Sequence, residues 1–572
     1  MPDTPLASAL ATPLLTRAAG WDAVRAGFRW PAPFRGPDAA PFNIAEAVCG
    51  RWARANPNGL ALIHLDRHLN PARWSHGALW EASGRLASAF AAHGLARGSR
   101  VALVLPQSPE ALITHLACWR LGAVSVPLFT LFGEDGLRYR MADSGAVFAV
   151  TDAEDMAKID AIRADLPALR QVFCIDGPMG GALGLMEEAA RASAPPPTAA
   201  TTFADPAFIS YTSGTTGPPK GALHGHSVLL GHMPGFEAHH DFAPHDGSLF
   251  WTPADWAWMG GLCNLLLPAL AYGSPVLSHR MARFDAEGAC WIMAQEGVRR
   301  AFLPPTALKL MRAVKNPRGL GVKLASVGSA GEALGAELLD WGVGALGLTI
   351  NEFFGQTEAN LVLTNASSVF APKPGSAGRS APGHNVCIID AEGRALPPGE
   401  DGEIAVDAPN PTMFLRYWNL PEKTAEKYAV DPETGVQRLR TGDVGRIDEE
   451  GHVFFSSRAD DVITTSGYRV GPSEVEDCLA GHPDVAMAGV IGVPDPVRTE
   501  VIRAYVVTAP GAQVDAEKLE AELIARVRGR LSPHLAPRRV EVIDALPMTA
   551  TGKIMRRELK RRAQAQAQQG EG

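Results

Sequence analysis

The chain has 572 residues, of which 46% are hydrophobic and 20% are charged, and this balance excludes a disordered or fibrous protein. Its formal net charge of −8 gives no global sign of a nucleic-acid partner. The seven cysteines contain no C-x-x-C pair, which argues against a disulfide framework or a zinc ribbon and favours a cytoplasmic location. The length predicts about three to five structural units.

The N-terminal segment and the region that follows it differ in pattern. Residues 1–41 are rich in alanine and proline, and we expect an irregular extension there. Further on, short apolar segments alternate with helical segments, which predicts parallel, doubly wound sheets covered on both faces. The predicted strands are 99–106, 123–128, 146–151, 171–175, 207–212, 274–279 and 298–303, and the predicted helices are 108–121, 153–165, 262–272 and 286–296.

One segment, 256–279, contains no Asp, Glu, Lys or Arg and is long enough to span a bilayer. Glycines and prolines interrupt it, however, and divide it into a turn, a short helix and a strand. We therefore interpret this segment as buried core and expect no membrane span.

The pattern changes near residue 375. Short strands at 387–390, 402–406 and 452–456, separated by Gly/Pro turns, predict a β-rich subdomain over about 375–457. After residue 458 a compact α+β segment follows, with strands at 485–493 and 502–508 and a helix over 516–531. The basic stretch 526–562 is interpreted as a solvated helix face or a contact for a polyphosphate, and the Gln/Ala tail 563–572 is expected to be disordered. The predicted domains are therefore 1–41, 42–458, 459–562 and this tail.

The strongest local signal is the segment 211–221, YTSGTTGPPKG, directly after an apolar strand. Its glycines permit close approach and positive φ, its hydroxyls donate hydrogen bonds, and Lys220 supplies positive charge. Such a loop can hold a phosphate chain. It is not a Walker A loop, since Lys220 is followed by Gly221 rather than by Ser or Thr.

Seven further motifs follow this loop in the chain. They are GSAGEA (328–333), FGQTE (354–358), YWN (417–419), LRTGD (439–443), SRADDVI (457–463), GYRVGPSEVE (467–476) and PMTATGK (547–553). In this order, over residues 42–562, the eight motifs resemble those of AMP-forming acyl-CoA synthetases, which belong to the adenylate-forming superfamily. The resemblance implies an α/β fold: a large N-terminal domain of doubly wound sheets, a small β-barrel-like subdomain, and a small, mobile α+β C-terminal domain.

The resemblance also implies a two-step ligase that uses ATP, Mg²⁺ and CoA. A carboxylate attacks the α-phosphate of ATP, pyrophosphate leaves, and the thiol of CoA then captures the acyl-adenylate. Chemistry of this kind depends on positioning and on neutralised charge more than on a covalent catalyst.

By this resemblance, the motifs of the N-terminal domain bind ATP. Glu358 is the magnesium-side carboxylate, Thr357 touches the α-phosphate, Asp443 accepts both ribose hydroxyls, and Arg458 contacts ribose or phosphate. The β- and γ-phosphates are held by Lys220 with Thr212, Ser213, Gly214, Thr215, Thr216 and Gly217. The adenine site is walled by Gly331, Glu332, Ala333, Glu352, Phe353, Phe354, Gly355 and Gln356, where Ala333 replaces a proline common in the family.

The resemblance further implies that one set of C-terminal residues acts in adenylate formation and another set in CoA transfer. Lys553 stabilises charge on the carboxylate and the α-phosphate during adenylation, and Asp460 is the hinge of a domain rotation. After rotation, Ser466, Gly467 and Arg469 face the pantetheine arm and the phosphates. Arg528 is a candidate contact for the CoA nucleotide, although an exposed helix face accounts for it equally well.

Substrate size is predicted from Trp258, Met259, Gly260 and Gly355. The segment 251–258 resembles the one before the acyl pocket of short- and medium-chain enzymes, with Trp258 as a wall of the pocket or as plain core, and Met259 and Gly260 follow it. Gly355 stands where acetyl-CoA synthetases carry tryptophan, so we expect a pocket that admits a longer or branched chain, and a Gly355→Trp variant that prefers acetate and propionate. The alternatives are an aryl- or substituted-acid CoA ligase, and an adenylation enzyme that loads a carrier protein in trans.

The remaining expectations concern partners. The substrate is a small carboxylic acid, and no nucleic acid is expected to bind. The family resemblance leaves open a lysine acetyltransferase that acts on Lys553, where acetylation would cancel the charge, and a homodimer.

Overall fold

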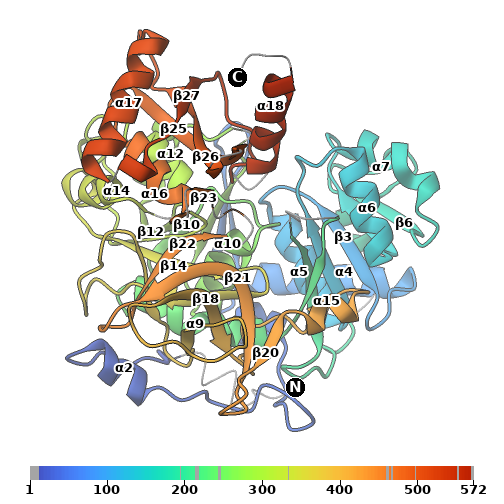
Figure 1. Ribbon diagram of the computed structural model, residues 1–572. Coiled ribbons are helices and arrows are strands. Elements are labelled where there is room, and N and C mark those ends of the chain that lie inside the picture. The colour runs from blue at the N-terminus through green and yellow to red at the C-terminus, as the bar shows by residue number, and fades with distance from the viewer. Residues whose placement is uncertain are drawn as a thin grey trace.

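The computed structural model describes residues 12–192, 195–212, 218–242, 246–281, 283–332, 334–458, 461, 463–465, 468–495, 498–531, 533–549 and 553–568. These residues form two large β-sheets with helices packed against them and a smaller third sheet (Figure 1). The α/β fold with a large N-terminal and a small C-terminal domain confirms the predicted fold class.

The first sheet has eight strands in the order β19–β9–β8–β4–β3–β5–β6–β7, and the strands from β8 to β7 run parallel. Alternate residues of β3 face opposite cores: Val101 and Leu103 pack with α4, α5 and α8, whereas Ala102 and Val104 pack with α6 and α7. The sheet is therefore covered on both faces, as predicted. Its strands are β3 (Arg100–Val104), β4 (Val124–Leu128), β5 (Phe148–Thr151), β6 (Gln171–Cys174), β7 (Leu183–Gly184), β8 (Pro206–Tyr211), β9 (Gly221–Gly225) and β19 (Arg416–Tyr417). Its helices are α4 (His76–Ala92), α5 (Pro109–Arg120), α6 (Glu134–Ser144), α7 (Met156–Ile162) and α8 (Leu185–Arg191).

The second sheet has fourteen strands and is parallel only in its middle, from β14 to β1. From β15 onward it is antiparallel, so the strands of the predicted β-rich segment continue this sheet. Its strands are β1 (Leu60–Leu65), β2 (Pro71–Ser75), β10 (Leu249–Trp251), β11 (Val276–His279), β12 (Val298–Phe302), β13 (Ser326–Ser329), β14 (Ile350–Gln356), β15 (Ala359–Thr364), β16 (Ser376–Ser380), β17 (Val386–Ile389), β18 (Asp401–Asp407), β20 (Tyr428–Val430), β21 (Gln437–Ile447) and β22 (His452–Arg458). The helices that lie between its strands in the chain include α12 (Ala286–Glu296), α13 (Pro305–Met311) and α14 (Ala336–Trp341), whereas α3 (Arg51–Ala55) contacts α4 and α15 (Pro421–Ala425) contacts β19.

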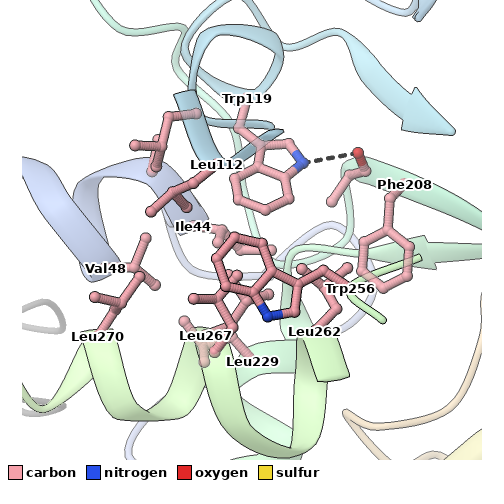
Figure 2. Close-up of a cluster of buried hydrophobic side chains, with 14 of the residues drawn as sticks. Ile44, Val48, Leu112, Trp119, Phe208, Leu229, Trp256, Leu262, Leu267 and Leu270 are labelled. Atoms are coloured by element: carbon pink, nitrogen blue, oxygen red, sulfur yellow. Dashed lines mark hydrogen bonds between the residues drawn. The ribbon is translucent and has the colours of Figure 1, made fainter. Parts of the chain in front are cut away.

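A central helix, α9 (Ser227–His239), packs against strands of both large sheets, and all thirteen of its residues are buried. The largest core cluster gathers around it (Figure 2). In this cluster Trp119 of α5 donates a hydrogen bond from Nε1 to the carbonyl oxygen of Ala207, 2.9 Å away, at the start of β8. Leu229 of α9 and Trp256 lie in the same group of side chains. One core therefore joins the helices of the first sheet to the segment that leads into the second.

The charge-free segment 256–279 forms part of this core. It contains α10 (Met259–Gly261), the helical turn 262–266, α11 (Leu267–Ala271) and strand β11, which confirms the predicted division into a turn, a short helix and a strand. Among the described residues, none of the helices combines the length and apolar character that a membrane crossing needs.

The C-terminal domain, drawn at the top of Figure 1, is built on the third sheet. Its strands are β23 (Ile463–Thr465), β24 (Tyr468–Val470), β25 (Val485–Asp495), β26 (Thr499–Thr508) and β27 (Arg539–Val542), and its helices are α16 (Pro472–Ala480), α17 (Ala516–Arg530) and α18 (Arg556–Gln568). The expectation of disorder from residue 563 is wrong over 563–568, because Ala563 is fully buried against Tyr505 and Leu559 and so anchors α18.

The N-terminal segment is also more ordered than expected, since it contains helix α2 (Trp21–Gly27). Trp21 is buried, donates from Nε1 to the carbonyl oxygen of Ser380 at 3.2 Å, and packs on Phe370. Earlier in the segment, the amides of Leu14 and Leu15 donate to the two carboxylate oxygens of Glu237 at 2.7 and 2.8 Å. The segment is thus tied to the last turn of α9.

We expect the substitution Glu237→Gln to lower the free energy of unfolding by about 1–3 kcal/mol. Glu237 is fully buried and also accepts a hydrogen bond from the Tyr272 hydroxyl. A glutamine would turn one acceptor into an NH₂ group that faces an amide donor of Leu14 or Leu15. Urea unfolding measures the change. Glu154→Gln, which removes an exposed partner of Arg280, is the control and should cost under about 1 kcal/mol; equal losses would refute the expectation.

The same variant should alter the pH dependence of stability. Burial raises the pKa of Glu237 to about 7 from its ordinary 4.5, although the three donors oppose this. Between these values the folded chain binds more protons at this site than the unfolded chain. Its contribution to stability is therefore complete below about pH 4.5 and is lost as the pH rises through 7. Glu237→Gln should remove this part of the pH dependence.

Candidate active site

The predicted phosphate loop is closed at its base by an antiparallel pair of strands. Tyr211, at the end of β8, pairs with Gly221, at the start of β9. The Thr212 amide donates to the carbonyl oxygen of Lys220 at 2.9 Å, which brings the two ends of the loop together. Ser213, Gly214, Thr215, Thr216 and Gly217 lie outside the described residues. The hairpin therefore carries Thr212 and Lys220 on either side of the predicted phosphate site.

Glu358 lies in the turn between β14 and β15 and is buried, with 8% of its surface exposed. Its carboxylate accepts a hydrogen bond from the Tyr417 hydroxyl, and its carbonyl oxygen accepts one from the Phe414 amide at 2.8 Å. The Nζ atom of Lys220 lies 4.8 Å from the centre of the Tyr417 ring. Tyr417 therefore connects the two charged residues predicted to act on ATP, and the half-buried Thr357 precedes Glu358 in the same turn.

Asp443 lies on β21 and is 3% exposed. Gln356, at the end of β14, donates from Nε2 to Asp443 Oδ2 at 3.3 Å and to the carbonyl oxygen of Thr441 at 2.9 Å. Lys427 Nζ donates in turn to Gln356 Oε1 at 3.2 Å. Gln356, which is predicted to line the adenine site, therefore contacts the carboxylate of Asp443, which is predicted to bind the ribose. Arg458 of β22 lies opposite Asp443 of β21 in the register of the two strands. The side chain of Arg458 is not among the described parts of the chain.

The remaining predicted adenine-site residues follow β13 or lie on β14, which are neighbouring parallel strands. Glu352 is buried, and its Oε2 accepts a hydrogen bond from the Leu334 amide at 3.1 Å. Burial raises the pKa of Glu352 well above its usual range, although this bond opposes the shift. Gly331 has a φ of +112°, a conformation that favours glycine, and so turns the chain after β13. Glu332 follows it, and Ala333 lies outside the described residues.

A row of rings lies beside this turn, and we call it the aromatic wall; it consists of Trp258, Phe302, Phe353 and His239. Successive ring centres are 5.8, 5.5 and 4.6 Å apart. A Cβ atom on Gly331 would lie 3.4 Å from Cη2 of Trp258, so the wall adjoins the predicted nucleotide site. Burial lowers the pKa of His239 to about 3, and the wall is therefore uncharged near neutral pH.

Met259 and Gly260, also predicted to line the acyl pocket, are buried at the start of α10. A Cβ atom on Gly260 would lie 2.8 Å from both Phe302 and Trp258, so glycine lets these two rings of the wall approach each other. Phe354 lies on the other side of β14 and packs toward Phe455, 6.4 Å away between ring centres. Phe353 and Phe354 therefore point to opposite faces, and only Phe353 belongs to the wall.

Gly355 is closely packed against the neighbouring strand, a feature that the sequence does not reveal. It lies at an irregularity in the pairing of β14 and β15, where an added Cβ would overlap the Leu361 amide nitrogen and lie 2.6 Å from Cα of Asn360. Glycine is required here because two backbones approach closely. The predicted effect of Gly355 on the size of the acyl pocket, and the predicted preference of Gly355→Trp for acetate and propionate, stay predictions.

We expect Gly355→Ala to destabilise the protein by about 1–3 kcal/mol, because the new methyl group meets backbone that cannot turn away. Loss of activity should accompany the loss of stability, since the turn between these two strands carries Thr357 and Glu358. Thermal and urea unfolding measure the effect. Gly344→Ala is the matched control, because an added Cβ there meets nothing within 4 Å. Equal stability of the two variants would contradict this account of Gly355.

The C-terminal site residues are described only in part. Lys553 is exposed, and its amide donates to Thr549 Oγ1 at 3.0 Å. Arg528 is exposed on the last turn of α17. Asp460, Ser466 and Gly467 lie outside the described residues, as does the side chain of Arg469 on β24. The hinge and CoA roles of these residues therefore stay predictions.

Two residues of the site had no predicted role. Tyr417 belongs to a motif that the sequence singles out, but its hydroxyl meets Glu358 only because β19 pairs with β9. Lys427 lies in no motif, and it reaches Gln356 from the segment between α15 and β20. Apart from the YWN motif around Tyr417, no local sequence pattern indicates either contact, because each contact joins residues that are far apart in the chain.

The donor set fits magnesium delivered with ATP. Mg²⁺ prefers oxygen ligands and commonly takes one or two protein carboxylates together with substrate phosphates. Within the described part of the chain, no cluster of three His, Cys, Asp or Glu side chains is placed to hold a metal. Glu358, a single buried carboxylate close to the phosphate hairpin, is the residue that would hold it.

Comparisons with known proteins agree with this geometry. Residues 49–418 match the model of the family described as AMP-binding enzyme, and residues 474–553 match the AMP-binding enzyme C-terminal domain. The chain is 32% identical to the mitochondrial acyl-coenzyme A synthetase ACSM3 of Rattus norvegicus over 534 residues, which cover 91% of this chain and 90% of that protein. It is 33% identical to the acetyl-coenzyme A synthetase of Bacillus subtilis (strain 168) over 527 residues, with the same coverage.

A solved structure extends the similarity to the whole fold. The crystal structure of the anthranilate CoA ligase AuaEII, in complex with anthranoyl-AMP, is similar with a TM-score of 0.83 and 25% identity, over 92% of this chain and 98% of that one. The similarity thus covers both the large N-terminal part and the C-terminal domain of the chain. The chain therefore belongs to the AMP-forming acyl-CoA synthetases of the adenylate-forming superfamily.

Proposed function

We propose that the protein activates a short- or medium-chain carboxylic acid as its acyl-adenylate and transfers the acyl group to CoA. The observation that carries this proposal is the meeting of Lys220, Glu358 and Tyr417 at one edge of the sheets, with Asp443 held by Gln356 close by. These groups supply a cation, a metal-binding carboxylate and a ribose acceptor, which together suit MgATP.

In the first half-reaction, an oxygen of the substrate carboxylate forms a bond to the α-phosphorus of ATP, and the bond to the β-phosphate oxygen breaks. Lys220 and the loop 212–217 hold the departing phosphates, while Asp443 fixes the ribose by accepting hydrogen bonds from its hydroxyls. Lys553 is proposed to neutralise charge that develops at the α-phosphate. Glu358 would hold the Mg²⁺ whose positive charge stabilises the pyrophosphate.

In the second half-reaction, the CoA sulfur attacks the acyl carbonyl carbon, and AMP leaves with the electrons of the broken C–O bond. We propose that the C-terminal domain turns between the two steps, with Asp460 as its hinge, so that Lys553 is withdrawn and residues 466–469 approach. Arg528 is the proposed contact for the CoA nucleotide.

The aromatic wall bears on the choice of acid. It is uncharged and adjoins Gly331, so it suits an apolar substrate tail rather than a charged one. Each buried methylene would contribute about 0.8 kcal/mol to binding. The second candidate is an aryl-acid CoA ligase, which the wall also favours because rings stack on rings, and AuaEII itself is named for an aromatic acid.

The test is pyrophosphate release with ATP, magnesium and CoA across straight-chain acids of two to ten carbons, together with branched, sulfur-containing and aromatic acids. A maximum at four to eight carbons supports the proposal. A maximum with aromatic acids supports the second candidate. A maximum at acetate refutes the proposed chain length of the substrate but not the proposed ligase reaction. Acyl-adenylate formation without CoA transfer would point to a carrier protein instead.

A further inference from the structure

A polar interface joins the C-terminal domain to the large domain beside the predicted adenine site. Helix α16 of the C-terminal domain faces Gly335, the residue before α14, and a Cβ atom on Gly335 would lie 3.9 Å from Cβ of Asp477. Arg526 of α17 reaches across to Glu337 of α14, 3.7 Å away. Arg526 is itself fixed to the end of α16, because it donates to the carbonyl oxygens of Cys478 and Gly481 at 2.7 and 2.6 Å.

The charges at this interface act on one another. Lys309 of α13 donates from Nζ to Glu332 at 3.2 Å. Burial opposes the charge of Lys309, yet Glu332 and then Asp477 raise its pKa. Burial raises the pKa of Asp477 to about 7, and Lys309 is the cation that most opposes this shift. Lys309 therefore pairs directly with Glu332 of its own domain and lies within electrostatic range of Asp477 of the other.

The same helix links this interface to the Lys553 loop. Glu476, next to Asp477, accepts hydrogen bonds from the Arg556 guanidinium at 2.7 and 2.8 Å. Arg556 begins α18 and follows Lys553 by three residues. Burial lowers the pKa of Arg556, but the carboxylates of Glu476, Asp461 and Glu332 outweigh this effect and raise it above its ordinary value. When Asp477 of α16 lies against Gly335 before α14, Arg556 is therefore held within electrostatic range of Glu332, and with it the nearby Lys553.

We propose that Lys309 and Asp477 are positioning residues of a domain clamp that holds the C-terminal domain in the arrangement for acyl-adenylate formation. This inference rests on the proposed function, because it requires that the two half-reactions use different domain arrangements. The clamp acts through Lys553 and touches neither the acid nor the thiol. It must open before CoA transfer.

An engineered disulfide tests which half-reaction the clamped arrangement serves. The Cβ separation between positions 335 and 477 lies within the range of natural disulfides, about 3.5–4.5 Å. The variant is Gly335→Cys with Asp477→Cys, in a Cys478→Ser background so that the neighbouring thiol cannot compete. Closure is followed by thiol counting, and each single-cysteine variant is the control for oxidation elsewhere.

The oxidised variant should release about one equivalent of pyrophosphate per enzyme and then stop, and it should convert preformed acyl-adenylate with CoA at least tenfold more slowly than the reduced form. Reduction should restore full turnover. Unchanged turnover in the oxidised form, or loss of pyrophosphate release with CoA transfer intact, would overturn the proposal, as would failure of the disulfide to close. Absence of acyl-CoA formation by the wild type would instead refute the proposed function.

Substitution provides a second measurement without a cross-link. Lys309→Met and Asp477→Asn should each slow single-turnover pyrophosphate release about tenfold and leave CoA transfer from preformed acyl-adenylate unchanged. The double variant should be no worse than either single variant, since both remove the same interaction. Lys373→Met, which removes a lysine paired with Asp448 at 2.7 Å on the β-rich part, is the control. Equal losses in both half-reactions would show a merely structural role.

Discussion

Replacing Lys553 by alanine should reduce pyrophosphate release from acid and ATP by at least a hundredfold, while CoA transfer from preformed acyl-adenylate proceeds at the wild-type rate. A positioned cation that stabilises developing charge at a reacting phosphate is commonly worth a factor of 10²–10³. Lys553 suits this role because it is exposed and held in place: its backbone bonds to Thr549, and Met548 bridges to Ile554 beside it.

Both half-reactions must be measured on the same preparation. Lys518→Ala is the matched control, since Lys518 is an exposed lysine of the same domain, on α17, with 76% of its side chain accessible. It should leave both rates unchanged. If Lys553→Ala slowed the two half-reactions equally, the proposed withdrawal of Lys553 between the steps would be refuted.

Much of the fold could be predicted because its strands and helices have clear local patterns. The predicted helix 286–296 matches α12 residue for residue, and each predicted strand of the parallel sheets ends within two residues of an observed strand. The parallel strands β1, β7, β10, β13 and β14 were not predicted. Helix α9 was not predicted, because it is buried on every side and has no polar face to give a helical period. The end of α18 was missed for a different reason. Its polar Gln/Ala sequence was interpreted as disorder, yet alanine and glutamine are good helix formers once Ala563 has a core to join.

The candidate site, like the fold, could be predicted from the sequence only in part. The motifs locate Lys220, Glu358 and Asp443 because each motif combines distinctive residue types: Lys220 precedes a strand, Glu358 lies in a turn, and Asp443 lies within β21. The contacts that bring these residues together could not be predicted, since Tyr417 lies 59 residues from Glu358 in the chain. Gly355 shows the limit most clearly. A glycine that widens a pocket and a glycine that lets two strands approach look the same in a sequence.

The substitution Glu358→Gln is the second change from which we expect a large effect, a loss of at least a hundredfold in pyrophosphate release. Glutamine keeps the shape and can still accept the hydrogen bond of Tyr417, but it lacks the charge that would bind Mg²⁺ and balance Lys220. The magnesium concentration for half-maximal rate should therefore rise. Stability should change little, because the hydrogen bond is kept.

Tyr417→Phe separates the charge of Glu358 from its positioning. It removes only the hydroxyl, so the buried carboxylate loses one donor while the ring beneath Lys220 stays in place. We expect a loss of about five- to twentyfold with an unchanged magnesium requirement, because removal of one hydrogen bond to a charged group typically costs about 1.5–3 kcal/mol, part of which water recovers. Tyr428→Phe on β20 is the control and should have no effect on rate. If Tyr417→Phe raised the magnesium requirement as much as Glu358→Gln does, the hydroxyl would be acting on the metal site itself, and the division of roles between Glu358 and Tyr417 would be wrong.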